Sequence, residues 1–524
     1  MGFRILAGFR ILAALVLACV MPRAAQAAWL EASSDHFVVY ADDSEKDILR
    51  LSRQLESYHA AMALALNART QTPSPSNRVT VFVVRTEGQV RKLYGEGSKY
   101  VGGFYLPRAG GSIAIVPSIR TGNGPVTISM VVLLHEYAHH MLMSTSAMTM
   151  PRWFNEGAAE FFASSSFEAG GEVWLGRPAQ HRAGELFFAK DVKAADLLDP
   201  ETYEKHSSNR YDAFYGKSWL LYHYLTFSPE RKGQLDRYVG LLREGKDQRE
   251  AAIEAFGDFD RLERDLDTYL TKRRISALKI PPSELKIGDV RVRTLRAGEA
   301  AIMPLRIQSK RGVNREMAKS LVVEARAIAG KYPGDAAVLA ALSECEHDAG
   351  NEAEAVAAAD AAIKLDPSQV NAYVQKGLAL FRLAETADDK RQAYRDARSD
   401  FVALNRLEND HPLPLIYYYR SFVQQGMEPP LLAIEGLIRA VELAPFDPGL
   451  RMNLGFALLK LGRSADARTV LGPVAYSPHG GDASTFAHKV IDRIDSDPSW
   501  KGDGMEADQT GDENSETDEG ESGN

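Results

Sequence analysis

Near its start the chain alternates apolar and polar side chains over short stretches, and this period of two predicts strands. Two of the stretches flank residues 107–111, whose proline and glycines predict a turn and therefore a hairpin. Elsewhere in this region apolar residues recur at helical spacing. The strands expected on this basis are residues 36–41, 78–84, 100–106 and 112–116, and the helices are residues 45–66 and 87–94.

From residue 129 the pattern becomes helical and stays so to residue 272, and a brief alternation over residues 288–307 predicts a small β linker. Beyond residue 317 small residues and prolines return at the positions of the 34-residue tetratricopeptide unit. Such helix pairs stack into a superhelix that commonly holds a peptide or a partner helix, although a spacer or dimer surface is equally compatible with the pattern. The clearest unit contains Leu339, Leu342, Ala355, Ala359, Ala362 and Pro367.

Candidate chemistry begins on the helix expected after residue 128, which carries His135, Glu136 and His139. Residues four apart lie on one face of a helix, so both imidazoles can reach one metal ion. Glu136 is turned away by about 100°, where it can address a metal-bound water. The apolar residues 131–134 would bury this helix. The spacing predicts a Zn²⁺ site with both histidines as ligands.

A second motif, WFNEGAAEFF at residues 153–162, offers a third ligand. Catalytic zinc sites use three protein ligands and leave one position for water. Glu156 follows His139 by 17 residues, enough for one helix to end and another to present a carboxylate. Glu160 lies one turn later, where it can hold the second ring nitrogen of a ligand histidine. We therefore expect Glu156 to be the third metal ligand and Glu160 to support it.

Together the two motifs resemble those of the gluzincin metallopeptidases, most closely the catalytic core of aminopeptidase-N-type enzymes. The resemblance implies an α+β zincin-like domain, a small mixed sheet plus helices, in front of the all-α superhelix. It also implies an oxyanion-binding tyrosine, and Tyr215 matches that position, although a core aromatic is the alternative reading. The implied reaction is peptide hydrolysis by a zinc-activated water, with Glu136 as general base and Tyr215 as hydrogen-bond donor.

The family pattern is incomplete. The chain has no Gly-Ala-Met-Glu-Asn motif and no large N-terminal β-domain, so endopeptidase action is expected over exopeptidase action. In zincin folds the strand before the active-site helix edges the cleft and pairs with extended substrate. On that basis Ile113, Ala114 and Ile115 are the candidate substrate-binding residues.

The N-terminus predicts export. Arg4 and Arg10, an apolar run over residues 11–20 and a small-residue site before Ala28 are typical of a signal peptide, which would leave a periplasmic or secreted protein. A lipid-anchored form through Cys19 is the less favoured alternative. No later segment is long enough to cross a bilayer.

Charge adds little to the choice of function. The formal net charge is −8, and residues 501–524 carry nine acidic side chains and one lysine, which predicts a disordered acidic tail. No basic patch with interleaved aromatic residues is present, which argues against nucleic-acid binding.

The sequence thus favours an exported zinc peptidase that acts on a peptide or protein substrate and binds a protein partner through its repeats. The alternatives are a catalytically silent zincin scaffold that serves as an interaction or assembly factor, and a metal-dependent hydrolase of non-peptide amides. The expected segments are a signal peptide (1–27), the zincin-like domain (28–275), the β linker (276–316), the repeat domain (317–480), a capping helix (481–499) and the tail (500–524).

Overall fold

The structure is a computed structural model of the 524-residue chain. It describes residues 29–95, 101–118, 122–145, 150–206, 212–477 and 480–505. The expected signal peptide, with Cys19, and nearly all of the acidic tail lie outside these residues. Among the helices of the described residues, none is long and apolar enough to span a membrane.

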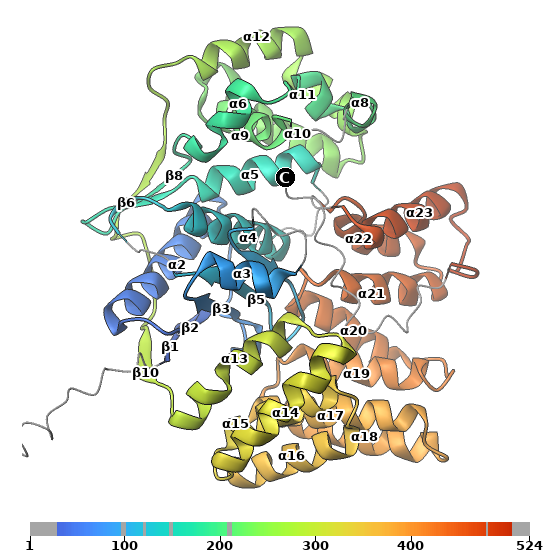
Figure 1. Cartoon of the computed structure of the whole chain (residues 1–524). Coiled ribbons are helices and arrows are strands. Elements are labelled where there is room, and N and C mark those ends of the chain that lie inside the picture. The colour runs from blue at the N-terminus through green and yellow to red at the C-terminus, as the bar shows by residue number, and fades with distance from the viewer. Residues whose placement is uncertain are drawn as a thin grey trace, which may run out of the picture.

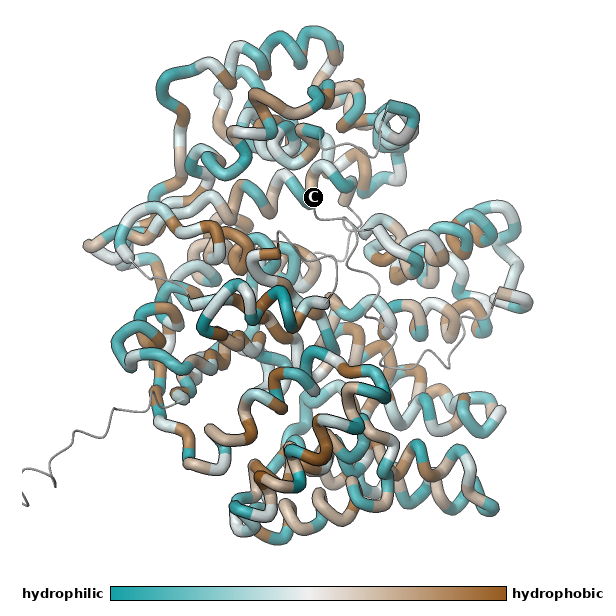
Figure 2. The backbone as a smooth tube through the Cα atoms, in the orientation of Figure 1, coloured by the Kyte–Doolittle hydropathy of each residue, from teal (hydrophilic) through white to brown (hydrophobic). Residues whose placement is uncertain are grey.

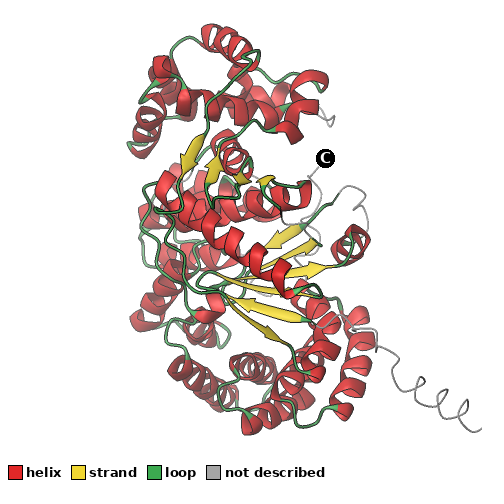
Figure 3. Ribbon diagram, turned by 90° about the vertical axis from the view of Figure 1, so that its left-hand side faces the viewer, coloured by secondary structure: helices red, strands yellow, loops and turns green. Residues whose placement is uncertain are grey.

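A six-stranded mixed sheet forms the centre of the N-terminal half, in the order β10-β1-β2-β3-β5-β4 (Figures 1 and 3). β2, β3 and β5 run parallel, whereas β1, β4 and β10 are antiparallel to their neighbours. The parallel strands are apolar on both sides, as strands are when both faces of a sheet are covered. The strands are β1 Leu30–Ser33, β2 Phe37–Ala41, β3 Val79–Val84, β4 Phe104–Leu106, β5 Ile113–Pro117 and β10 Arg291–Thr294.

Helices cover both faces of this sheet. Phe37, Val81 and Ala114 turn to one face and share a core with α2 and α4. Phe82 and Ile115 turn to the other face and pack with α3 and α13. The helices concerned are α2 Glu45–Ala65, α3 Glu87–Tyr94, α4 Ile128–Thr145 and α13 Ala297–Arg311.

A group of helices continues the first core beyond α4, and a small four-stranded sheet in the order β6-β7-β8-β9 lies beside it (Figure 1). The strands are β6 Gly124–Pro125, β7 Ser166–Phe167, β8 Val173–Leu175 and β9 Leu278–Ile280. The helices are α5 Arg152–Ala163, α6 Ala183–Phe188, α7 Ala194–Leu198, α8 Pro200–His206, α9 Phe214–Phe227, α10 Gln234–Arg243, α11 Gln248–Phe256 and α12 Phe259–Leu270.

From α13 onward the chain is a series of antiparallel helices that curves along one flank of the N-terminal half (Figure 1). Figure 2 shows hydrophobic residues interspersed with hydrophilic ones along these helices, as expected when one side of each is buried. The helices are α14 Arg315–Lys331, α15 Ala336–Asp348, α16 Glu352–Leu365, α17 Val370–Glu385, α18 Lys390–Leu407, α19 Pro412–Val423, α20 Leu431–Leu443, α21 Pro448–Lys460, α22 Ser464–Ala475 and α23 Asp482–Ser496.

The two halves meet along the turns that precede α19 and α21. Glu408 accepts hydrogen bonds from the backbone N–H of Ser76 at 2.9 Å and from its hydroxyl at 2.8 Å. Asp447 accepts one from the backbone N–H of Ala109 at 2.9 Å. The imidazole of His140, at the end of α4, lies 4.3 Å from the ring of Phe446. The helix that carries the histidine motif therefore contacts the helical superhelix directly.

The region expected to be a β linker, residues 276–316, is divided between both halves. β9 completes the small sheet, β10 completes the large sheet, and α13 packs on both halves. On α13, Met303 and Ile307 face the sheet, whereas Ile302 and Leu305 belong to the core formed with α14 and α15. The alternation over residues 288–307 therefore contains one short strand and most of a helix.

Candidate metal centre

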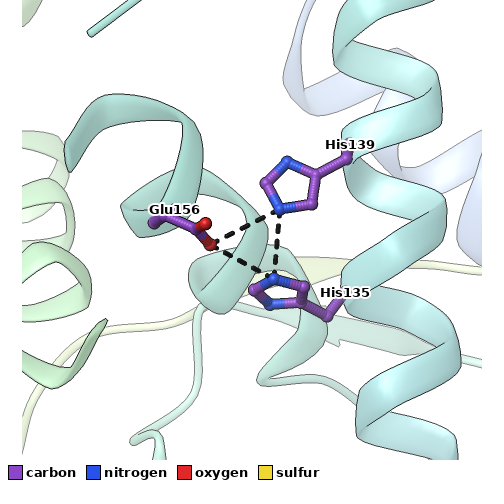
Figure 4. Close-up of side chains that lie close together, drawn as sticks. All are labelled: His135, His139 and Glu156. Carbon is purple, nitrogen blue, oxygen red and sulfur yellow. Dashed lines mark hydrogen bonds and ion pairs between the residues drawn. The ribbon is translucent and has the colours of Figure 1, made fainter. Parts of the chain in front are cut away.

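α4 presents the histidine motif toward α5. It is an apolar helix, and its buried side carries Leu133, Leu134 and Ala138 along with His135 and His139. Both imidazoles lie on the same side of the helix, with their Nε2 atoms 3.1 Å apart (Figure 4). The side chains of His135 and His139 are only 9% and 5% exposed.

Glu156 points from α5 at the same two nitrogens (Figure 4). Its Oε2 atom lies 3.3 Å from Nε2 of His135 and 3.4 Å from Nε2 of His139, and its side chain is fully buried. Two ligands at tetrahedral positions around zinc, each about 2.1 Å from the ion, are separated by roughly 3.4 Å. The three ligand atoms are therefore spaced as a tetrahedral zinc ion requires, and two imidazoles with one carboxylate are donors that zinc accepts.

Glu160 lies one turn further along α5, on the far side of the His135 ring. Its carboxylate is 3.1 Å from Nδ1 of His135, 2.5 Å from Nε2 of His181 and 2.6 Å from Nη2 of Arg182. Burial by itself would lower the pKa of His135, but Glu160 and Glu156 outweigh it and raise that pKa to about 10. Burial would raise the pKa of Glu160, and the Arg182 and His135 charges instead hold it well below its usual range.

The close approach of α5 to α9 depends on the glycine that follows Glu156. A β-carbon at Gly157 would lie 2.5 Å from the backbone oxygen of Ser218 in α9. Glycine is therefore required where the two helices cross, and this crossing sets the position of Glu156 relative to α9.

Tyr215 lies in the first turn of this neighbouring helix, α9, close enough to the cluster for the Glu156 charge to affect its phenol. The carboxylate of Glu156, followed by burial, raises the pKa of the Tyr215 phenol above its usual range. The guanidinium of Arg182 lies 4.7 Å from the centre of its ring. Glu136 directly follows His135 in α4, and its side chain is half-buried.

The three residues expected to pair with an extended substrate do not lie at an edge of the sheet. Ile113, Ala114 and Ile115 lie in β5, which pairs with β3 on one side and β4 on the other. They are 3%, 1% and 0% exposed. A strand paired on both sides has no free backbone edge, so these residues cannot bind a peptide by strand addition.

Two residues of the cluster had no signal in the sequence. His181 and Arg182 both contact Glu160, yet they follow it by about twenty residues in a stretch without a recognisable spacing. Only the fold brings them to α5, since they precede the short helix α6, which packs on α9.

Comparisons with known proteins return repeat proteins. No family model matches the chain, and no curated protein does. Among solved structures, a thermophilic tetratricopeptide-repeat protein from Thermus thermophilus matches with 16% identity and a TM-score of 0.30, over 33% of this chain and 90% of that one. YrrB, described as a tetratricopeptide-repeat protein with an unusual peptide-binding site, matches with 21% identity and a TM-score of 0.26, over 33% and 92%. Yeast Tom70 matches with 12% identity and a TM-score of 0.26, over 89% and 78%.

These findings correct the family and fold expected from the motifs. The expectation of a gluzincin peptidase is corrected: no family model and no curated protein of that kind matches the chain, and the solved structures described above are repeat proteins. Of the expected fold class, the all-α repeat part fits, and a six-stranded mixed sheet with helices is present, but the zincin-like assignment is corrected, since helices account for about 63% of the described residues. A motif of five to ten residues fixes the spacing of a few side chains, and it does not determine the topology around them.

The expected activity is corrected with them. The reading as an enzyme, with the terms hydrolase, protease and metalloprotease, is corrected as well: no peptidase family model and no curated peptidase matches the chain, and the solved structures described above are tetratricopeptide-repeat proteins. The roles given to Glu136 and Tyr215 as general base and oxyanion donor depended on that reaction and are withdrawn with it.

Proposed function

We propose that this protein is an interaction scaffold whose helical superhelix binds a segment of a partner protein. The observation that carries the proposal is a row of half-buried apolar side chains on two neighbouring helices, α17 and α19. We call this row the α17–α19 stripe; its members are Val374, Leu378, Leu415, Tyr418 and Phe422. On each helix they are three or four positions apart, so they share one face.

The two helices of the stripe touch through their side chains. The rings of Phe381 in α17 and Tyr417 in α19 are 4.8 Å apart beneath it. At one end Tyr418 and Phe422 meet edge to face at 5.3 Å, and the guanidinium of Arg398 lies 5.2 Å from the Phe422 ring. An apolar strip that ends in a cation suits a peptide with apolar side chains and one acidic residue.

Photo-crosslinking tests this proposal. A benzophenone amino acid at Tyr418 should give one reproducible adduct with a partner, whereas the same group at Leu432 should not. Leu432 is the matched control because it is 65% exposed on α20 and lies outside the stripe. The Tyr418 adduct should disappear when Phe422→Asp is added, since a carboxylate on the stripe opposes apolar contact.

Two outcomes would contradict the scaffold proposal. One is an adduct pattern that is the same from Tyr418 and Leu432, which would indicate unspecific contact. The other is proteolysis of a mixed-peptide library by the unmodified protein that is lost in Glu136→Gln, which would make the protein an enzyme.

We also propose that His135, His139 and Glu156 hold a Zn²⁺ ion. The support is their near-equal spacing of 3.1 to 3.4 Å and their burial. Bound zinc would link α4 to α5 and supply a Lewis-acidic centre whose remaining position is left to water. Glu160 would fix the ring of His135 from behind, as carboxylates commonly do for metal-bound histidines.

A further inference from the structure

A second surface for protein binding lies far from the stripe, on the outward face of the small sheet. β7, β8 and β9 bury Phe167, Val173, Leu175 and Ile280 toward the core. Alternation along β8 turns Trp174 to the opposite side, in register with Lys279 of β9. The Trp174 indole is only partly buried, so part of its ring remains accessible.

Trp174 forms part of a hollow of about 660 Å³. The hollow is lined on its apolar side by Trp174, Pro178, Ile275 and Ala277, and its rim carries charges of both signs. The rim pairs are Glu168 with Arg177 at 3.5 Å and Glu172 with Lys279 at 3.2 Å.

The hollow borders an exposed strand edge. β9 pairs with β8 on one side, and within the described residues it ends the sheet on the other. Leu278 is 37% exposed there, and the neighbouring Lys279 is also exposed. An edge strand offers backbone hydrogen bonds to an added strand, and a side-chain hollow beside it can select one residue of that strand.

Charge determines which peptide fits. The two acidic and two basic residues of the rim balance each other, but the segment leading into β9 adds Lys272, Arg273 and Arg274, all exposed. The segment before β9 is therefore basic, and it would attract an acidic chain and repel a basic one.

We infer that the edge of β9 binds an extended acidic peptide of a partner protein by strand addition, with one apolar side chain of that peptide seated on Trp174. This site is separate from the α17–α19 stripe and does not depend on it. Lys279, whose Nζ lies 5.6 Å from the Trp174 ring, would then turn to the acidic flank of the peptide.

Fluorescence anisotropy with three synthetic peptides tests the inference on the full chain. The probe alternates glutamate and valine around a central phenylalanine. The first control replaces this phenylalanine by alanine, and the second replaces the glutamates by lysines. We expect the probe to bind and each control to bind at least about tenfold more weakly. The first control lacks the apolar side chain, and the second lacks the charge attraction. A probe N-methylated along one backbone edge should also bind more weakly, because it cannot complete the ladder.

Variants of the protein separate the site from general effects. Trp174→Ala should weaken probe binding about tenfold, whereas Trp174→Phe should retain it, since an aromatic floor remains. Lys279→Glu should weaken it, and Leu432→Asp on α20, an exposed position outside both surfaces, should leave it unchanged. Unfolding temperatures of the variants show whether any loss reflects misfolding.

Several results would overturn the inference. These are failure of the unmodified protein to bind the probe, equal binding of the lysine peptide, or binding that is unaffected by Trp174→Ala. Binding of a chitin oligosaccharide with quenching of Trp174 fluorescence, and no binding of the probe, would make this a saccharide site instead.

Discussion

His135 stands between two buried carboxylates, with Glu156 at one ring nitrogen and Glu160 at the other. Without a metal ion, a proton on the imidazole compensates part of this negative charge. A zinc ion at Nε2 would take over that role, because a ligand histidine must give up its proton on that nitrogen. Either a zinc ion or a proton on His135 can therefore compensate the buried negative charge of Glu156 and Glu160.

The first prediction concerns the metal. Purified protein should contain about one zinc per chain, and His139→Ala or Glu156→Gln should lose most of it, since two ligands hold zinc far more weakly than three. Metal content is measured by mass spectrometry after dialysis. His206→Asn is the control, because His206 is exposed and bonded to Asp196, and its zinc content should not change. Equal zinc in all variants would refute the ligand assignment.

The second prediction concerns Gly157. Gly157→Ala should lower the free energy of unfolding by about 1–3 kcal/mol or more, because its β-carbon would meet the backbone of Ser218 at 2.5 Å. Chemical denaturation measures the change. Gly240→Ala is the matched control, since no atom lies within 4 Å of the added carbon in α10, and it should stabilise by roughly 0.5–1 kcal/mol. A neutral Gly157→Ala would mean that α5 and α9 can move apart freely.

For single residues, the sequence predicted the contact wherever both side chains lie on the same helix. His135 and His139 meet because helical spacing alone places them together, and no knowledge of the fold was needed. Arg182 reaches Glu160 only through a turn and the packing of α6, which the sequence does not encode locally. The reaction could not be predicted from the sequence, because the ligand spacing does not specify what surrounds the metal.

Among the elements, α13 has the most demanding position, since two of its sides are buried in different cores. Its sequence pattern mixes two apolar stripes, which together resemble an alternation, and this explains the strand expected over residues 288–307. The strands β2 to β5 and the helices α2 and α3 could be predicted because their apolar runs and helical spacings are local signals, whereas β1 was not predicted. The order of the strands could not, since β10 comes from beyond residue 290 to pair with β1.

The third prediction concerns Asp400 in α18. Burial raises the pKa of its carboxyl to about 6, although Lys376 lies 3.4 Å away. Because the folded state holds this proton more tightly than the unfolded state, its stabilising effect is full below about pH 4 and is lost as the pH rises through 6. Asp400→Asn should therefore gain on the order of 1–3 kcal/mol over the natural protein at pH 8 and about half as much at pH 5.

Thermal unfolding at the two pH values checks this. Lys376 keeps Asp360 at 2.9 Å in the variant, so no lysine is left without an acidic neighbour. Asp396→Asn, an exposed change on the same helix, should show no such dependence on pH. A gain of equal size at both pH values would mean that the Asp400 charge is not the cause.

In the whole molecule, buried polar contacts join the superhelix to the sheet. The fourth prediction is that Glu408→Ala lowers the free energy of unfolding by about 1–3 kcal/mol, because two donors of Ser76 lose their acceptor. Hydrogen exchange at residues 74–77 should become faster. Glu442→Ala removes an exposed ion pair with Arg439 and should change little. Unchanged exchange in Glu408→Ala would show that the Glu408 hydrogen bonds do not hold residues 74–77 in place.

The pairing of β1 with β10 has a consequence for the time course of folding. Leu30 is among the first described residues and pairs with Thr294, which the ribosome adds 264 residues later. Until then one edge of β1 is an open template for another chain, the situation that most favours aggregation of nascent proteins. A chain interrupted before residue 291 would keep that edge exposed for its whole lifetime. Fragments that end there should therefore self-associate, even when their remaining core is complete.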